Sequence, residues 1–316
     1  MKAVIDPAQK AEQNEKKLYG GVETGGTKIN CLIAAGPNDI RAEARYSTTT
    51  PDENVRQIVS FFQHHMRETP IQALGIASFG PLDLTAGSPT YGYVTVSNKP
   101  AWEFSNIAGK LQDALQVPAV IDTDVNGAAL GEYVWGAARN VENVLYITVG
   151  TGIGVGVVIN GKPLHGLVHP EGGHILVPHD WLADPFIGVC PFHGDCLEGL
   201  ASGPAMRRRW GQPAESLDAE HPAWYLEASY LGLGLHNLIL SLSPNRIVMG
   251  GGVMNQKHLF PLIRRKVQQC LSGYLHADLI TLKIDEYIVP AGLAPRSGML
   301  GAIALAASYA QPGTPV

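Results

Sequence analysis

Short apolar runs alternate along the chain with longer segments whose apolar residues recur every three or four positions. The short runs have the length of buried β-strands, and the longer segments have the spacing of amphipathic helices. The strand-like runs are "LYGGVE", "INCLIAA", "ALGIAS", "PAVIDTD", "VLYITV", "RIVMG" and a stretch at about 280–290. Helical spacing covers about 50–66, 107–115, 125–138 and 225–241, a segment from about 260, and a final Ala-rich segment. This alternation predicts an α/β fold.

Two stretches repeat one order of features: a strand, a Gly/Thr turn and a second strand. The first is "YGGVETGGTKINCLIAAG" (19–36) and the second is "VLYITVGTGIGVGVVING" (144–161). Because each hairpin stands ahead of further helices and strands, we expect two similar α/β lobes that meet near residue 125. The expected parts are a polar extension at 1–18, an N-terminal lobe at 19–125 that shares part of the C-terminal helix, a C-terminal lobe with a Cys/His loop at 126–307, and a flexible tail at 308–316.

The segment at about 50–66 carries a signal for the start of a helix. Thr50 precedes Pro51, and Glu53 follows three residues after the threonine. A Thr with a Glu three residues later is the pattern of a capping box, and Pro is favoured at the first helical position. We therefore expect a helix that begins at Pro51 and is closed by a capping box.

The composition narrows the function classes. The 316 residues are 45% hydrophobic and 16% charged, as in globular proteins. The net charge of −5 gives no support to the binding of nucleic acid or of an anionic membrane surface. The chain has no apolar run of about 18 residues that would span a membrane, and its polar first residues lack the apolar core of a secretory signal. We therefore expect a cytoplasmic protein with neither a membrane nor a nucleic acid as a partner.

The two Gly/Thr turns are candidate phosphate-binding sites. The first, "ETGGTK", presents Thr24, Thr27 and Lys28, and the second, "TVGTGIG", presents two threonines and Gly152. Neither turn matches the P-loop or the dinucleotide pattern G-x-G-x-x-G. Glycine lets backbone N–H groups come close to a phosphate, and hydroxyls donate to it. Each turn taken alone is also compatible with a simple hairpin.

Glycine or polar residues also follow two other predicted strands, where ligands of α/β folds commonly bind. The run "MGGGVM" (249–254) fits either a wall against a flat ligand such as adenine or a tight turn from strand to helix. The segment "IDTDVNGAALGE" places Asp122, Asp124 and Asn126 where a strand gives way to a helix. An Asp in such a place is either a helix cap or a general base, and the sequence leaves open which of the two aspartates has which role.

A compact Cys/His cluster is the strongest chemical signal. Five of the 11 histidines fall between residues 165 and 193, and "CPFHGDC" spaces Cys190, His193 and Cys196 as C-x₂-H-x₂-C. Together with His174 of "EGGH", two thiolates and two imidazoles suit a tetrahedral Zn²⁺ ion. The alternative is a loop with scattered polar residues. The other two cysteines, Cys31 and Cys270, lie in apolar patterns that are typical of core positions.

These motifs together resemble the ROK family (repressor, open reading frame, kinase) of sugar kinases. The resemblance covers about 20–307 and rests on "GGVETGGTK", "IDTDVNGAALGE", "TVGTGIGVG", "EGGH", the Cys/His loop and "GGGVM". Glu23 stands where most members have Asp, and His193 replaces one Cys of the zinc loop, and both departures are similar to the bacterial fructokinase branch. The resemblance implies the two-lobed ribonuclease H-like fold of actin, Hsp70 and sugar kinases, with the active site in the cleft between the lobes.

The resemblance also implies roles for individual residues. Asp124 would be the catalytic base, and His174 would bind zinc and brace Glu171. The sugar hydroxyls would be held by Asn98, Asn126, Glu171 and Glu198. The phosphates would lie against Thr24, Gly26, Thr27, Lys28, Gly150, Thr151 and Gly152, and the adenosine against Pro204, Gly250, Gly251, Gly252, Val253 and Met254. The expected zinc ligands are His174, Cys190, His193 and Cys196, with His165, His169 and His179 as competitors.

The activity implied by the resemblance is the phosphorylation of D-fructose at O6 by ATP and Mg²⁺, in a homodimer that holds a structural Zn²⁺. Mannose, glucose or an N-acetyl amino sugar remain alternative substrates. A non-catalytic sugar-binding protein is a further alternative, against which Asp124 and the two Gly/Thr turns argue. A repressor is not expected, because the about 19 residues before the first glycine turn are few and not basic.

Overall fold

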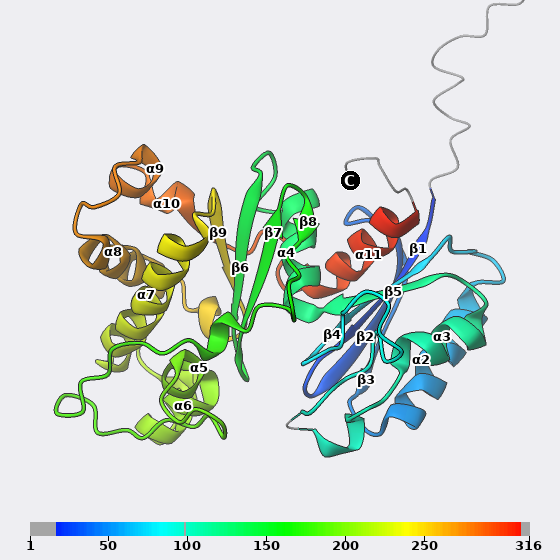
Figure 1. Cartoon of the computed structure of the whole chain (residues 1–316), viewed down its shortest axis with the longest axis horizontal. Helices are drawn as coiled ribbons and strands as arrows, with labels where there is room; N and C mark the ends of the chain where they lie inside the picture. The colour runs from blue at the N-terminus through cyan, green and yellow to red at the C-terminus, as the bar shows by residue number, and fades with distance from the viewer. Residues whose placement is uncertain (1–16, 98, 311–316) are drawn as a thin grey trace, which may run out of the picture.

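The computed structural model describes residues 17–97 and 99–310, and it consists of two lobes, each built on a five-stranded sheet (Figure 1). The two lobes lie side by side, and the helices α4 (Asp124–Val134) and α11 (Ser297–Ala310) lie between the sheets. The predicted α/β fold with two similar lobes is confirmed.

The sheet of the N-terminal lobe has the strand order β3-β2-β1-β4-β5. Strands β1 to β3 are antiparallel neighbours, whereas β4 and β5 run parallel to β1. Apolar side chains of both faces are buried. Helices α2 and α3 cover one face and α11 covers the other. The bounds are β1 Tyr19–Thr24, β2 Lys28–Gly36, β3 Asp39–Ser47, β4 Leu74–Ser78, β5 Ala119–Thr123, α2 Pro51–His65 and α3 Ile107–Leu115.

The sheet of the C-terminal lobe has the order β10-β9-β6-β7-β8. Read from β8, each strand occupies the place of its counterpart in the first sheet, and the same pairs are parallel or antiparallel. Helices α7 and α8 pack on one face, and α4 packs on the other. The bounds are β6 Asn143–Val149, β7 Ile153–Ile159, β8 Lys162–Pro163, β9 Arg246–Gly250, β10 Ile288–Pro290, α7 Ala223–Leu242 and α8 Leu259–Leu271.

The two central helices cross at glycines. A Cβ atom added to Gly301 of α11 would lie 2.0 Å from the carbonyl oxygen of Gly127 of α4. A Cβ atom added to Gly75 of β4 would lie 1.9 Å from the carbonyl oxygen of Ala302. Glycine is therefore required at these positions for the backbones to come together. Through these contacts α11 holds α4 against the N-terminal sheet, and the two lobes are joined.

Shorter elements connect this frame. They are α5 Leu197–Ala201, α6 Gly203–Trp210, α9 Asp278–Thr281, α10 Ile284–Tyr287, and the single 3₁₀ turns at Pro100–Trp102, Gly172–His174, Ala214–Ser216 and Val253–Asn255. In the described part of the chain, none of the helices combines the length and the apolar composition that a membrane crossing needs.

Two expectations about these elements were wrong, and one strand was missed. The stretch at about 280–290 forms the short helices α9 and α10, and only its last three residues form a strand, because its apolar positions fit one helical turn as well as a strand. Helix α2 begins at Pro51 as predicted, but the Thr50 side chain makes no capping hydrogen bond. Strand β3 was not predicted, because at this sheet edge its residues alternate between partly buried and exposed and it lacks an apolar run.

Candidate active site

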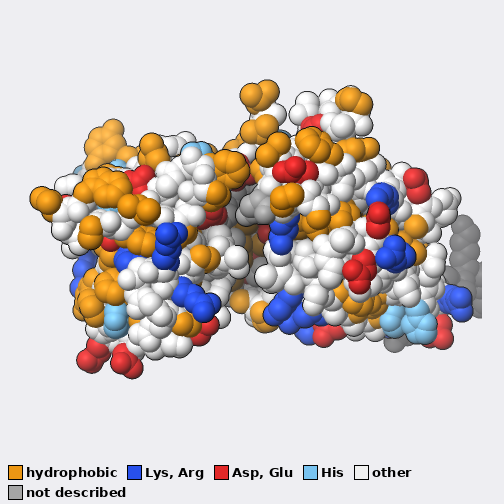
Figure 2. Space-filling model, turned by 90° about the horizontal axis from the view of Figure 1, so that it is seen from below, with side chains coloured by type: hydrophobic (Ala, Val, Ile, Leu, Met, Phe, Trp, Pro, Cys, Tyr) orange, Lys and Arg blue, Asp and Glu red, His pale blue; other side chains and the backbone are white. Residues whose placement is uncertain are grey.

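The surface is hollowed between the two lobes, as the space-filling view from below shows (Figure 2). Strand β5 of the N-terminal lobe ends here and passes directly into α4. Loops of the C-terminal lobe reach the same place, since His165 contacts Asp122 and His169 contacts Leu82. The cleft between the lobes therefore brings together titratable side chains from segments that are far apart in the sequence.

Asp124 is the first residue of α4, and its side chain is largely shielded from water. Its Oδ1 accepts a hydrogen bond from the Val125 amide at 2.9 Å. Burial, and then the negative charges of Glu23 and Glu171, raise the pKa of Asp124 to about 7. A carboxylate with such a pKa can take up a proton near neutral pH, as a general base must.

The carboxylate of Asp122, by contrast, is bonded to neighbouring protein groups. It accepts hydrogen bonds from the Thr123 amide, from Nδ2 of Asn126 at 2.8 Å and from Nε2 of His165 at 2.9 Å. The cap of α4 is neither aspartate but Thr123, whose Oγ1 accepts from the Asn126 amide at 3.1 Å. Asn126 is buried, and its Oδ1 accepts from the Val157 amide at 3.2 Å. Asp122 and Asn126 thus tie β5 to β7, while Asp124 is left for chemistry.

Glu23, at the end of β1, is one functional candidate that the sequence analysis gave no role. Nδ2 of Asn30 donates to its carboxylate at 2.8 Å, and burial raises its pKa. A Cβ atom on Gly298, at the start of α11, would lie 2.1 Å from this carboxylate. Glu23 therefore lies in a close-packed place beside α11, and its charge acts on Asp124.

Glu171 and Glu198 come together from the two ends of the Cys/His loop. Glu198 Oε2 accepts from the Ile153 amide at 3.0 Å, directly after the second Gly/Thr turn, and its Oε1 lies 4.0 Å from Nε2 of His174. Burial, and then the charge of Glu198, raise the pKa of Glu171, whose side chain is still half exposed. These carboxylates are suited to accept hydrogen bonds from hydroxyl groups of a ligand.

The four expected metal ligands form one cluster. One ligand atom from each of His174, Cys190, His193 and Cys196 lies within 4.8 Å of all the others. Nδ1 of His174 is 3.6 Å from both sulfur atoms, and Nδ1 of His193 is 3.6 Å from the sulfur of Cys190. A set of two thiols and two imidazoles fits tetrahedral Zn²⁺ and leaves no position for a water ligand. The other nitrogen of His174 points toward Glu198.

The three competing histidines have other partners. His165 contacts Asp122, His169 accepts from the Leu82 amide at 3.0 Å, and His179 contacts Asp195 at 2.9 Å. Within residues 17–97 and 99–310, the cluster of possible metal ligands consists of the four predicted residues. The contacts of His165 and His169 were not predicted, although the crowding of histidines in this stretch of sequence was a signal that it lies at a site.

The first Gly/Thr turn is open to solvent. Gly26, Thr27 and Lys28 are exposed, whereas Thr24 is buried and its hydroxyl donates to Oγ of Ser78 at 2.7 Å. The turn itself is closed by a bond from the Gly25 amide to the Lys28 carbonyl at 2.8 Å. The exposed residues are free to meet a ligand, while Thr24 braces β1 against β4.

The second turn meets the third glycine run. Thr151 is exposed, and the carbonyl of Gly150 accepts from the Gly203 amide at 2.8 Å. A Cβ atom added to Gly150 would find only the amide nitrogen of Gly252, at 3.9 Å, and one added to Gly252 would find open space. The second turn, the run at 249–254 and the start of α6 therefore lie side by side and present bare backbone.

The other residues expected at the nucleotide and sugar are not all at this surface. Pro204 is exposed in the first turn of α6, and Gly251 has a φ of +92°, which favours glycine. Gly250, Val253 and Met254 are buried, the last two in the core of the C-terminal lobe. Asn98 lies outside the described residues.

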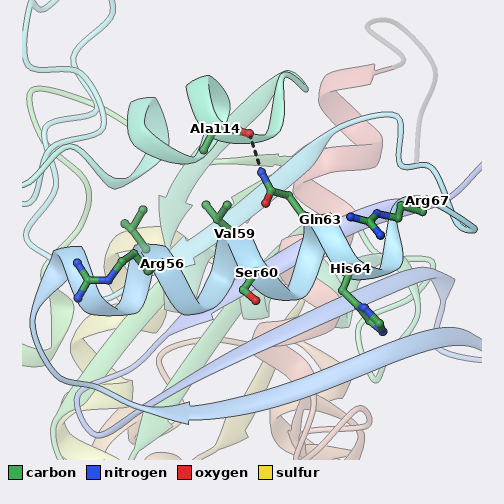
Figure 3. A pocket seen from close by; sticks show the side chains of 8 residues that line it. Arg56, Val59, Ser60, Gln63, His64, Arg67 and Ala114 are labelled. Carbon is green, nitrogen blue, oxygen red and sulfur yellow. Dashed lines mark hydrogen bonds between the residues drawn. The ribbon is translucent and has the colours of Figure 1, made fainter.

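A separate groove lies on the outer side of α2, facing α3 (Figure 3). It encloses about 510 Å³, and its floor contains Val59 and Ala114. Arg56, His64 and Arg67 stand around it. Since it contains neither a glycine turn nor any of the clustered carboxylates, it is distinct from the candidate active site.

Comparison with known proteins agrees with this arrangement. The family model described as "ROK family" matches residues 19–309. The chain is 42% identical to a fructokinase of Zymomonas mobilis over 93% of this chain and 98% of that protein. It is 40% identical to a putative fructokinase of Bacillus subtilis over 92% of this chain and 95% of that protein.

Solved structures share the fold. A ROK hexokinase from Thermus thermophilus has a TM-score of 0.76 at 26% identity and covers 94% of this chain and 100% of its own. A ROK glucokinase from Streptomyces griseus, in complex with glucose and AMPPNP, has a TM-score of 0.74 at 26% identity and covers 92% of this chain and 99% of its own. The predicted two-lobed sugar-kinase fold is therefore confirmed, and the chain belongs to the ROK family.

Proposed function

We propose that this chain is an ATP-dependent fructokinase, which transfers the γ-phosphoryl group of ATP to O6 of D-fructose. Five relatives are 37–42% identical to this chain; four bear the name fructokinase and one the name putative fructokinase. These names support fructose as the acceptor. The observation that carries phosphoryl transfer is Asp124, a shielded carboxylate with a pKa of about 7 in the interlobe cleft.

In the proposed reaction Asp124 takes the proton of the attacking hydroxyl. The exposed carboxylate of Glu171, with Glu198 and Asn98, would fix the orientation of the sugar so that this hydroxyl faces Asp124. Asn126, which is buried and bonded to Asp122 and Val157, would support this site from behind. Phosphoryl transfer requires mostly positioning and charge stabilisation, so two carboxylates that orient the acceptor contribute directly to the rate. Closure of the lobes would exclude water, which otherwise competes as an acceptor.

The nucleotide would lie along the glycine-lined surface. Gly26, Thr27 and Lys28 from one lobe, and Gly150, Thr151 and Gly152 from the other, offer hydroxyls, an ammonium group and backbone amides to the phosphates. Gly251, Gly252 and Pro204 would border the adenosine, with Gly250, Val253 and Met254 supporting them from the core. Mg²⁺, bound with ATP, would neutralise charge on the β- and γ-phosphates.

Zinc would be structural. Four protein ligands leave no open position, so an ion held by His174, Cys190, His193 and Cys196 would activate no water. Its effect would be to fix the loop between Glu171 and Glu198. The contact of His174 with Glu198 supports this proposal, because the second nitrogen of a metal-bound imidazole commonly faces a carboxylate.

A homodimer in the cytoplasm, without nucleic acid, remains part of the proposal. The surface near the Cys/His loop supports self-association, because Leu167, Leu176, Leu182, Ile187 and Phe192 are exposed. Light scattering of the purified protein tests this point. We also propose that the lobes divide near residue 125, where β5 passes into α4.

A hexose panel with Mg-ATP tests the proposed function. We expect the highest kcat/KM for D-fructose among fructose, mannose, glucose and N-acetylglucosamine. Glucose is the second candidate, because a glucokinase of Halalkalibacterium halodurans is 29% identical over 75% of this chain. A higher kcat/KM for another hexose would assign that sugar instead, and no turnover of any hexose would contradict a kinase.

A further inference from the structure

A loop of the C-terminal lobe holds on to the N-terminal lobe by two histidines. It follows β8 and contains "LHGLVHPEGGH" (164–174). His165 binds Asp122, and His169 binds the backbone of Leu82. His165 is half exposed, but only 5% of the His169 surface is accessible. His169 is therefore part of the contact between the lobes and is closed off from water.

The hydrogen bonds of His169 define which nitrogen carries the proton. The Leu82 amide donates to Nε2 at 3.0 Å, so Nε2 must be the acceptor nitrogen. In a neutral imidazole the other nitrogen, Nδ1, then bears the hydrogen. Burial lowers the pKa of His169, which favours this neutral form. Nδ1 lies 3.3 Å from Oε1 of Glu171, within reach of that carboxylate, and the Pro170 carbonyl is a second acceptor for the ring.

Glu171 has few other means of holding its position. Its side chain is about half exposed, and it lies in a loop just before a single 3₁₀ turn. An exposed Glu side chain rotates freely unless something holds it. The neighbouring charge of Glu198 repels it, and burial of its inner part disfavours the ionised form. A donor at Nδ1 of His169 opposes both effects by holding one carboxylate oxygen.

We propose that His169 is a positioning residue, which fixes the Glu171 side chain for sugar binding. Because His169 is itself held by Leu82, the position of Glu171 then depends on where the opposite lobe lies. The proposal rests on the proposed function, since it assigns Glu171 to the sugar. Leu82 belongs to the segment after β4, where it is paired with Val94. Movement of that segment would pull on Nε2, turn the imidazole and release Glu171. The sugar site would then be complete only when both lobes are in contact.

Two amide substitutions separate the contact of His169 with Leu82 from its contact with Glu171. A Gln amide reaches about as far as Nε2, so His169→Gln keeps a partner for Leu82 but loses the donor to Glu171. An Asn amide reaches about as far as Nδ1, so His169→Asn keeps a donor for Glu171 but loses the anchor on Leu82. A side chain that only filled space or joined the lobes would be replaced well by Gln.

We expect His169→Gln to keep the melting temperature and the KM for ATP, but to raise the KM for fructose about tenfold, which is the usual loss for a hydrogen bond to a charged group. His169→Asn should raise this KM less. His258→Gln is the matched control, because His258 packs on Trp224 in the core of the C-terminal lobe, and it should leave both KM values unchanged. A wild-type KM for fructose in His169→Gln would overturn the proposal.

A double-mutant cycle makes the test specific for Glu171. If His169 acts through Glu171, then His169→Gln should have little further effect on the KM for fructose in a Glu171→Gln background. Full additivity would overturn the proposal. Equilibrium binding of radiolabelled fructose gives the same comparison without turnover. Failure of the proposed function is a different result: the wild-type protein would phosphorylate no hexose, or would prefer a hexose other than fructose. The cycle is then run with the preferred sugar, or by equilibrium binding alone.

Discussion

The two Gly/Thr turns occupy equivalent places in the two sheets, but their surroundings differ. Each turn is closed by its own backbone, by the Gly25 amide and the Lys28 carbonyl in the first and by the Gly150 amide and the Gly152 carbonyl in the second. The first turn is also held by Thr48, whose hydroxyl donates to the Gly25 carbonyl at 2.8 Å. The turn between β6 and β7 is held by neighbours: its Gly150 carbonyl accepts from the Gly203 amide, and Glu198 accepts from the next amide after it. The two turns thus have different neighbours, and Glu198, beside the second turn, is the one that also contacts the Cys/His cluster.

This difference shows how one fold serves two tasks. In the N-terminal lobe the chain proceeds from the second strand straight into edge strand β3 and helix α2. In the C-terminal lobe, β8 is followed by the loop that carries Glu171, the four possible metal ligands and Glu198. We therefore expect changes in the metal loop to affect the second turn and to leave the first turn unaffected.

The largest effect on kcat is expected at Asp124, which lies between the two turns in the sequence and belongs to neither. Asp124→Asn should lower kcat by about 10²–10⁴-fold, the usual cost of losing a general base, and leave the KM for ATP nearly unchanged. Steady-state kinetics of the purified variant measure both. Retention of more than about half of the activity would show that Asp124 has no catalytic role, and Asp122 would become the next candidate.

The pH dependence should report the same carboxylate. Because its pKa is raised to about 7, Asp124 loses its proton as the pH rises through this value, and only the ionised form can act as a base. We expect kcat/KM to fall about tenfold per pH unit below the pKa and to level off above it. Glu23 and Glu171 are the acidic groups whose charge raises this pKa, so Glu23→Gln should move the limb to lower pH. A flat profile between pH 5.5 and 8.5, the range of the measurement, would contradict this assignment.

The Cys/His cluster tests the connection of the second turn. Cys190→Ser should lose zinc, lower the melting temperature and raise the KM for fructose about tenfold or more, with a smaller change in the KM for ATP. Elemental analysis of protein purified without added metal gives the metal content. Cys270→Ser is the control, since Cys270 lies on α8, away from the cluster. Less than about 0.2 Zn per wild-type chain would contradict the four-ligand site.

The smallest effects compare the turns directly. Thr27→Val and Thr151→Val should each raise the KM for ATP by several-fold, because each removes one exposed hydroxyl worth about 1 kcal/mol. Thr24→Val should instead lower the melting temperature, because the Thr24 hydroxyl is buried and bonded to Ser78. An unchanged KM for ATP in both of the first two variants would show that the turns are merely structural.

The sequence predicted features that depend on neighbouring residues and missed those that depend on packing. Both hairpins and the four possible metal ligands follow from local pattern, since three of these ligands lie in "CPFHGDC" and the fourth is 16 residues earlier. The contact of His169 with Leu82 spans 87 residues, and that of His165 with Asp122 spans the two lobes. Such contacts depend on the relative placement of two sheets, for which the chain has no local signal.

The place of α11 has a consequence for the order in which the protein can fold. This last helix covers a face of the first sheet, where Ile303 and Ala306 pack with Tyr19 and Leu32. During synthesis from the ribosome, that sheet therefore exposes an apolar face until about 170 further residues have been made, counting from the end of β5 to Ser297. The C-terminal sheet, by contrast, is completed by β10 at Pro290, just before α11 begins. We expect the first lobe to form its core under α2 and α3 early, and to be the lobe whose other face a chaperone must shield until α11 arrives.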